Sequence, residues 1–180
     1  MIRIESIRTT HEAYDFVENL LISAFPEEER RELALQREYT DSNPLFRTNV
    51  IYQGEQPVGV ITCWDFDTFS YIEHFAISPD CRNGGYGQKV LTRMDELLAK
   101  PIVLEVEMPT TELSNRRIGF YKRLGYTLWE KEYRQPPYHA GDGYLPMRIM
   151  AKGALNPESD FESVKAKLYK DVYNVKSTED

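Results

Sequence analysis

The stretch CRNGGYGQKV, residues 81–90, gathers three glycines between an arginine and a lysine, in a chain with only 10 glycines in 180 residues. An apolar run with the character of a strand, TFSYIEHFAI at residues 68–77, precedes it. Apolar residues then recur at the spacing of an amphipathic helix: Val90, Leu91, Met94, Leu97 and Leu98. The first backbone N–H groups of a helix lack partners within the helix, and glycines let a phosphate approach them. The stretch therefore predicts an anion-binding loop, with a plain turn as the alternative.

Two common nucleotide-binding loops do not fit this stretch. Gly85 and Gly87 supply the first two glycines of a GxGxxG fingerprint, but Val90 stands where the third glycine belongs. The chain has no GxxxxGK[ST] run, which excludes a P-loop. The anion that the loop binds must therefore be sought in another class of protein.

The charge distribution also favours a local anion site. The net charge of −7 argues against a nucleic-acid-binding protein. Two segments, residues 81–94 and 113–129, contain seven basic residues and no acidic ones. Such basic islands in an acidic chain indicate a confined anion site, and solvated helix faces are the alternative.

Composition places the chain among soluble globular proteins. Hydrophobic residues make up 41% and charged residues 28%, and no apolar run approaches the roughly 18 residues that cross a bilayer. The first ten residues alternate in polarity, unlike a secretory signal. Cys63 and Cys81 are too few for a disulfide framework or a zinc site. We expect a cytoplasmic protein without a metal, without nucleic-acid or membrane partners, and either monomeric or homodimeric.

Periodicity predicts the order β-α-α-β-β-β-α-β-α-β-β-α, a mixed α/β or α+β sheet domain. Thr9 and Glu12 are spaced as a capping box before the first helix. PEEERRELALQREY, residues 26–39, is expected to form the second helix from its first turn onward. Gly125 should end the fourth helix, and Asn156-Pro157 should open the last one. We expect a frayed tail from about Asn174.

A resemblance to a known family emerges from Arg82-x-x-Gly85-x-Gly87 after a strand that ends in AISP. This pattern resembles the signature of the GNAT acetyltransferase superfamily, Q/R-x-x-G-x-G/A at the start of a long helix. SNRRIGFYKRLGY, residues 114–126, resembles the second motif of that family, and the resemblance extends over about residues 45–150. It implies the GNAT fold, a twisted mixed sheet splayed between its fourth and fifth strands. We expect one GNAT domain over 1–155, with a C-terminal helix and tail, 156–180, packed on it.

The resemblance also implies a co-substrate, acetyl-CoA, and the residues that hold it. Backbone groups of the strand would pair with the pantetheine amides, and one of them would polarise the thioester carbonyl. The glycine loop would hold the pyrophosphate, and Asn115 would contact the pantetheine arm or a phosphate unless it only caps its helix. The predicted cofactor-binding residues are Phe75, Ala76, Ile77, Arg82, Asn83, Gly84, Gly85, Tyr86, Gly87, Gln88 and Asn115.

Transfer of an acetyl group to an amine needs a proton acceptor for the amine and a proton donor for the departing thiolate. We predict Glu73 as the acceptor, with a salt-bridged or substrate-orienting carboxylate as the alternative. His74, on the other side of the strand by parity, is expected to be a packed structural histidine. Tyr121, whose hydroxyl the resemblance places near the thioester sulfur, is the predicted donor, with a core tyrosine as the alternative.

Two segments are candidates for the acceptor wall. FPEEERRE, residues 25–32, offers carboxylates that could attract a cationic amine, and EYRQPPYHAGDG, residues 132–143, could reach the cleft. A solvated helix start and a surface loop are the alternatives. The candidate acceptor residues are Glu28, Trp64, Tyr138 and His139, of which Trp64 could equally belong to the core.

The sequence therefore predicts an acetyl-CoA-dependent N-acetyltransferase. The acceptor would be a primary amine of a small molecule or a peptide, attacking the thioester directly in a ternary complex. A non-catalytic acyl-CoA-binding module and a transferase of longer acyl groups are the alternatives.

Overall fold

A computed structural model describes residues 1–176 of the chain. The chain divides into two compact units, Met1–Ile102 and Val103–Asp180, which are taken in turn. Strands and helices follow one another in the order that periodicity predicts, so the mixed α/β class is confirmed. Within the described part of the chain, no helix is both long and apolar enough to cross a membrane.

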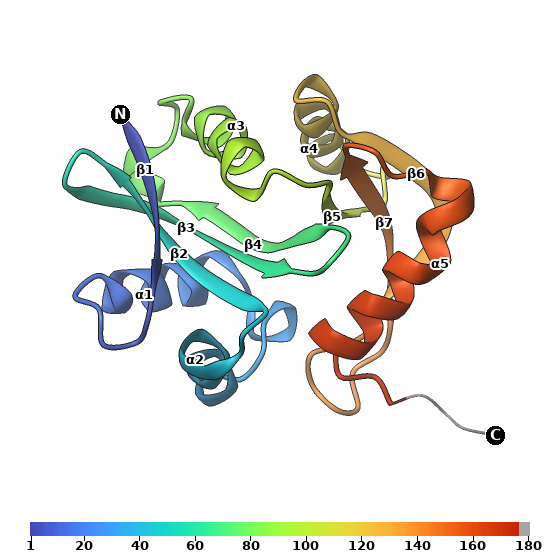
Figure 1. Cartoon of the computed structure of the whole chain (residues 1–180), viewed down its shortest axis with the longest axis horizontal. Helices are drawn as coiled ribbons and strands as arrows, with labels where there is room; N and C mark the ends of the chain where they lie inside the picture. The colour runs from blue at the N-terminus through green and yellow to red at the C-terminus, as the bar shows by residue number, and fades with distance from the viewer. Residues whose placement is uncertain (177–180) are drawn as a thin grey trace. The chain divides into compact units, whose positions relative to one another are not determined.

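The first unit is built on four antiparallel strands in the order β1-β2-β3-β4 (Figure 1). Helices α1 and α2 lie on one side of these strands, and α3 lies on the other (Figure 1). The elements are β1 (Ile2–Ile7), α1 (Tyr14–Ala24), α2 (Leu33–Ser42), β2 (Phe46–Gln53), β3 (Gln56–Asp65), β4 (Ser70–Ile77) and α3 (Tyr86–Leu98).

The core of this unit forms where α1 meets the sheet. Tyr14, Val17, Leu20 and Leu21 recur at helical spacing and are all buried. They belong to one apolar cluster with residues of the first three strands, including Val50, which is fully buried. Burial of about 25 cal/mol per Å² of apolar surface makes such contacts the main source of stability.

The start of α1 differs from the prediction. The helix begins at Tyr14 without a side-chain cap, so the capping box predicted from Thr9 and Glu12 is wrong. Thr9 instead donates its backbone N–H and its hydroxyl to the carboxylate of Asp41, at 2.9 and 2.6 Å. A tertiary partner therefore replaces the local one.

The second helix is also interrupted. A 3-10 turn over Glu27–Glu29 is followed by extended backbone at Arg30, and α2 starts only at Leu33. The single helix predicted over residues 26–39 is therefore wrong. The break lets the side chain of Arg31 leave the helix surface and enter the interior, where it is 3% exposed.

The second unit contains three strands in the order β5-β7-β6, with β6 and β7 antiparallel. Helix α5 packs on β6, where the rings of Trp129 and Phe161 meet at 6.5 Å. A π-helical turn, Leu168–Val172, continues α5. The elements are β5 (Ile102–Glu107), α4 (Glu112–Arg123), β6 (Thr127–Gln135), β7 (Leu145–Lys152) and α5 (Pro157–Lys167).

The ends of the helices in this unit follow the sequence signals. The Thr111 hydroxyl accepts from the N–H of Ser114, and the Ser114 hydroxyl accepts from the N–H of Thr111, a reciprocal capping box. Gly125 follows α4 with a φ of 95°, and the side chain of Asn156 caps α5, as predicted. Of the predicted frayed tail, residues 177–180 lie outside the described part of the chain.

Candidate active site

The glycine loop joins β4 to α3, as the sequence predicts. Gly85 caps α3 with a φ of 69°, in the left-handed region that favours glycine, and Asn83 has a φ of 70°. A Cβ on Gly84 would come within 2.6 Å of the Tyr86 ring, so this glycine lets the ring fold back. The helix start has no side-chain cap, which leaves its first N–H groups available to an anion.

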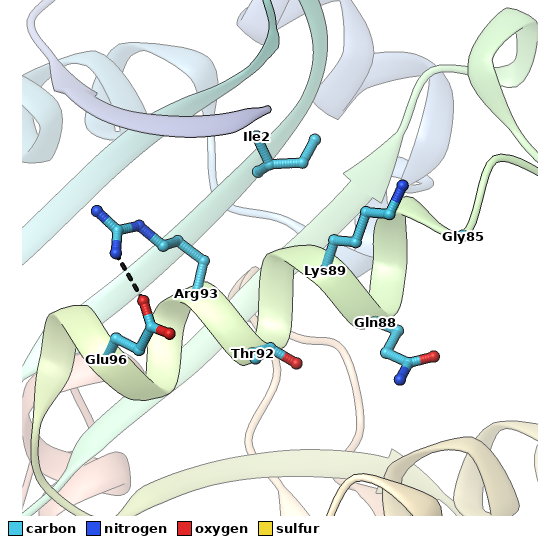
Figure 2. Close-up of a pocket in the computed structure, with 7 residues that line it drawn as sticks. All are labelled: Ile2, Gly85, Gln88, Lys89, Thr92, Arg93 and Glu96. Atoms are coloured by element: carbon cyan, nitrogen blue, oxygen red, sulfur yellow. Dashed lines mark hydrogen bonds and ion pairs between the residues drawn. The ribbon is translucent and has the colours of Figure 1, made fainter.

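A groove of about 520 Å³ runs along the exposed side of α3 and reaches the start of β1 (Figure 2). Two predicted cofactor residues, Gly85 and Gln88, line it together with the cations Lys89 and Arg93. Arg93 pairs with Glu96 at 2.6 Å, and the Lys89 ammonium lies 5.7 Å from the Tyr86 ring. The groove is lined by Ile2, Gly85, Gln88, Lys89, Thr92, Arg93 and Glu96.

Strand β4 carries an irregularity at Glu73. Ile72 pairs with Cys63 and His74 pairs with Thr62 on β3, so Glu73 is an extra residue in the ladder. Such a bulge disturbs the alternation of side chains along a strand. The expectation that His74 lies on the other side of the strand from Glu73 is therefore wrong, and the His74 Nδ1 atom lies 3.5 Å from a Glu73 oxygen.

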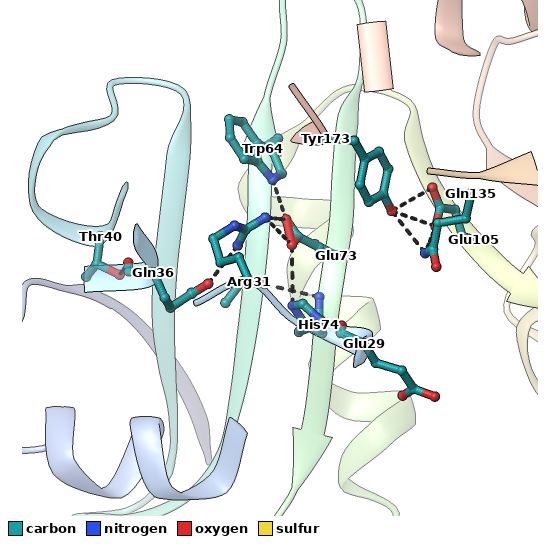
Figure 3. A network of polar contacts seen from close by, with 11 residues as sticks. Glu29, Arg31, Gln36, Thr40, Trp64, Glu73, His74, Glu105, Gln135 and Tyr173 are labelled. Carbon is teal, nitrogen blue, oxygen red and sulfur yellow. Dashed lines mark hydrogen bonds and ion pairs between the residues drawn. The ribbon is translucent and has the colours of Figure 1, made fainter. Parts of the chain in front are cut away.

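The Glu73 carboxylate is completely buried and firmly held (Figure 3). One terminal nitrogen of Arg31 donates to both of its oxygens, at 2.7 and 2.5 Å, and the Trp64 indole donates at 2.7 Å. Burial by itself raises the pKa of Glu73, but the Arg31 charge, His74 and these hydrogen bonds outweigh it, so the pKa lies below its ordinary value. Glu73 is therefore a salt-bridged carboxylate, which is one of the alternatives to a general base that the sequence leaves open.

His74 is buried beside this pair. Its Nε2 atom lies 2.8 Å from the backbone carbonyl of Glu29, and its ring packs edge-on against Phe25 at 4.6 Å. Burial lowers the pKa of His74 below its ordinary value, against the opposing effect of the Glu73 carboxylate. These contacts fit the packed structural histidine expected from the sequence.

The predicted acceptor residues of the first unit have different environments. Trp64 is 1% exposed and packs on Tyr39, Phe46 and Phe66, so it belongs to the core and supports Glu73. Glu28 is exposed on the 3-10 turn.

The predicted proton donor, Tyr121, lies near the end of α4 in the second unit. Its ring packs against those of Phe120 and Tyr126, at 5.3 and 5.6 Å. Within residues 1–176 the Tyr121 hydroxyl has no hydrogen-bond partner. Burial raises the pKa of Tyr121, against the effect of Arg117, so the hydroxyl keeps its proton.

Asn115 lies in the first turns of the same helix. Its side-chain amide donates to the carbonyls of Thr111 and Pro109, at 2.9 and 3.3 Å. The cap itself is Thr111, so Asn115 fastens the segment before the helix.

A second strand glutamate with several partners, the half-buried Glu105 on β5, is not predicted from the sequence. The Tyr133 hydroxyl donates to it at 2.6 Å, and the Tyr173 hydroxyl contacts both of its oxygens, at 2.9 and 2.8 Å (Figure 3). Gln135 also donates to it. A charge within the apolar strand IVLEVE was the signal that could have identified this residue.

The acceptor candidates of the second unit lie in the segment after β6. The Tyr138 ring packs edge-on against that of Tyr173 at 5.3 Å, and the backbone carbonyl of His139 accepts a hydrogen bond from the backbone N–H of Asp142.

The Tyr133 hydroxyl, which donates to Glu105, remains protonated because burial, followed by the Glu105 charge, raises its pKa far above the ordinary value. Among residues 1–176, no group of three or more His, Cys, Asp or Glu side chains could hold a metal ion.

Comparison with known proteins agrees with this arrangement. A family model of the GNAT acetyltransferases matches residues 13–126, which include the glycine loop, the bulged strand and Tyr121. The chain belongs to the GNAT acetyltransferase family.

Relatives of this GNAT protein extend the match to nearly the whole chain. A GNAT-family protein of Bacteroides thetaiotaomicron is 51% identical, with a TM-score of 0.95 over 97% of this chain and 99% of that one. The acetyltransferase-family protein YjbC of Bacillus subtilis is 30% identical over 80 residues, 43% of this chain. That match spans 41% of YjbC, less than half of its length.

More distant structures share the fold. Naa50 of Arabidopsis thaliana, solved with a bisubstrate analogue that contains CoA, is 16% identical, with a TM-score of 0.61 over 84% of this chain and 98% of that one. An aminoglycoside 6′-N-acetyltransferase in complex with coenzyme A is 16% identical, with a TM-score of 0.60 over 86% and 98% of the two chains.

Proposed function

We propose that this GNAT protein is an N-acetyltransferase that moves the acetyl group of acetyl-CoA to a primary amine of a small molecule or a peptide. The observation that carries the proposal is the glycine loop, with its uncapped helix start and the left-handed Gly85, inside a chain of this family. The backbone N–H groups of the loop and of the first turn of α3 would bind the pyrophosphate. Lys89 and Arg93 add positive charge on the groove beside it.

In the proposed reaction the neutral amine nitrogen attacks the thioester carbonyl directly, in a ternary complex. A carbon–nitrogen bond forms and the nitrogen gives up one proton to a base or to water. The carbon–sulfur bond breaks, the thiolate of CoA leaves with a proton from Tyr121, and the tyrosine regains its proton from water. The available hydroxyl and raised pKa of Tyr121 suit a donor that is neutral before the reaction. The backbone amides around Phe75–Ile77 would polarise the thioester carbonyl and pair with the pantetheine arm.

The amine must also lose a proton, because an alkylammonium with a pKa of about 10.4 cannot attack. The sequence predicts Glu73 for this step. The Glu73→Gln variant tests that role, since loss of a general base lowers kcat and alters the dependence of rate on pH.

The acceptor is proposed to be cationic in solution. Glu27, Glu28 and Glu29 present consecutive carboxylates on an exposed turn, which favours ammonium groups over acidic acceptors. Tyr138 and His139 are proposed as further residues that contact the acceptor.

A thiol-release assay tests the proposal with acetyl-CoA and panels of polyamines, amino sugars, other amines and peptides. We expect amine-dependent release of free CoA, and mass spectrometry should find the acetylated amine. Tyr121→Phe should lower kcat about 10²-fold or more while acetyl-CoA affinity stays close to wild type. Binding of acetyl-CoA without transfer to any amine would instead make the protein a binding module.

A further inference from the structure

The richest cluster of buried charge in the first unit lies at the bulge of β4. Arg31 and Glu73, with side-chain exposures of 3% and 0%, form its centre. Burying two charges costs several kcal/mol per ion unless their geometry and further hydrogen bonds compensate. The contacts that this pair makes must therefore offset the cost of its burial, and they show which segments the pair holds together.

The Arg31 guanidinium contacts a carboxylate, a side-chain amide and two aromatic rings. One terminal nitrogen donates to both Glu73 oxygens, and the other donates to the Gln36 side chain at 2.6 Å. Its guanidinium carbon lies 5.1 Å from the ring centre of Tyr39 and 5.4 Å from that of Phe46, within the range of cation–π attraction. A lysine could not make the same forked contacts.

The pair fastens one particular segment to β4. Arg31 lies two residues after the end of the turn Glu27–Glu29, and the carbonyl of Glu29 lies 2.8 Å from the His74 Nε2 atom. Neighbouring residues of the bulge thus hold this segment at two points, His74 at the last residue of the turn and Glu73 at Arg31, two residues further on. Arg30 adds an internal brace by donating to the carbonyl of Phe25 at 3.1 Å.

The same contacts make Glu73 poorly suited to accept a proton from a substrate. Its carboxylate has no exposed surface, and its oxygens already accept hydrogen bonds from Arg31 and Trp64. A general base must reach the proton that it takes, directly or through one water.

We propose that Arg31 and Glu73 are a positioning pair. The pair fixes the turn Glu27–Glu29, the glutamate turn, on β4 for recognition of a cationic amine, and Glu73 does not take the amine proton. This inference rests on the proposed function for its acceptor. The fastening of the turn can be measured without any substrate.

Three variants test the pair, with acetyl transfer to the best amine as the first readout. Arg31→Met and Glu73→Gln should each raise the KM for the amine about tenfold, with kcat changed less than about threefold and the KM for acetyl-CoA unchanged. The double variant should cost little more than either single one, because both remove the same contact. Arg31→Lys should recover only part of the loss.

Arg37→Met is the matched control. Arg37 also forms a two-point ion pair with a glutamate, Glu18, but its side chain is 52% exposed. This variant should keep wild-type values of KM and kcat.

Hydrogen exchange of the protein without substrate gives the second readout. Amides of residues 27–32 should exchange at least about tenfold faster in the Arg31 and Glu73 variants than in wild type, and at the wild-type rate in Arg37→Met. If a single variant fails to fold, the double variant decides, since removal of both charges leaves no unpaired buried ion.

Each possible result decides the question. A loss of kcat by about 10²-fold or more in Glu73→Gln, with the acidic limb of the pH–rate profile gone, would make Glu73 the base and overturn the proposal. Unchanged amine KM and unchanged exchange in the double variant would overturn it as well. If the wild-type enzyme acetylates no amine, the proposed function fails, and the exchange experiment still decides whether the pair fastens the turn.

Discussion

Two strand glutamates, Glu73 on β4 and Glu105 on β5, are held in contrasting ways. An arginine and an indole surround Glu73, whereas two tyrosine hydroxyls and an amide donate to Glu105 within the second unit. The first carboxylate contacts a full positive charge, and these three donors to the second are neutral. The side chain of Glu73 has no exposed surface, whereas Glu105 is half-buried. A strand carboxylate can thus be held by a charged partner or by neutral donors, and loss of a partner should have different effects at the two sites.

The largest effect is expected from Arg31→Met, which leaves the Glu73 charge buried without its guanidinium. We expect a loss of about 3–5 kcal/mol in the free energy of unfolding, because one partner of a buried ion pair is removed. Urea denaturation followed by tryptophan fluorescence measures it. Equal stability of this variant and wild type would show that the pair does not stabilise the fold.

Removing the charge of the second carboxylate should cost less. Glu105→Gln keeps an acceptor for the Tyr133 and Tyr173 hydroxyls but removes the charge from both bonds, so we expect a loss of about 1.5–3 kcal/mol. Urea denaturation under the same conditions measures this loss in the free energy of unfolding, so that it can be compared with the loss in Arg31→Met. A loss larger than that of Arg31→Met would reverse the ranking of the two sites.

A single neutral donor should matter least within the second cluster. Tyr173→Phe removes one hydroxyl, while Tyr133 and Gln135 still donate to Glu105, so a loss of about 1 kcal/mol is expected. The same denaturation experiment measures it, with Tyr169→Phe as a nearby control at a tyrosine whose hydroxyl donates to the carbonyl of Arg134. A loss comparable to that of Glu105→Gln would mean that Tyr173 alone holds the carboxylate.

Acid should destabilise the β4 site in two steps. The pKa of His74 is lowered in the folded protein, so its contribution is complete above about pH 6.5, the unfolded value, and is lost as the pH falls below it. The lowered pKa of Glu73 adds a further loss below about pH 4.3, as the pH falls toward the folded value. Urea titrations at a series of pH values should show both losses, and His74→Gln should remove only the first. A variant with the wild-type pH dependence would exclude His74 as its source.

The order of strands and helices could be predicted because it depends on local patterns. The stripe on α3, the glycine after α4 and the cap at Asn156 each act within a few residues of themselves. The glycine loop was found for the same reason, since its spacing and its place between strand and helix are visible in the sequence.

The contacts of Glu73 could not be predicted, because they depend on segments far apart in the chain. Arg31 lies 42 residues from Glu73, and the bulge that brings His74 to the same side is a property of the ladder with β3. Thr9 illustrates the same limit, since a local cap was predicted and a partner 32 residues away, Asp41, was found. Side-chain pairing across the fold overrides local preference where a better partner is available.

The extra residue in β4 also bears on how related sequences should be aligned. A strand one residue shorter at this point would restore a regular ladder with β3, in which consecutive side chains face opposite sides of the sheet. The two attachments of the glutamate turn could not both survive such a deletion. A one-residue gap at Glu73 therefore marks relatives that must hold the segment corresponding to the turn Glu27–Glu29 by other means. The presence of this gap can sort the family into groups before any activity is measured.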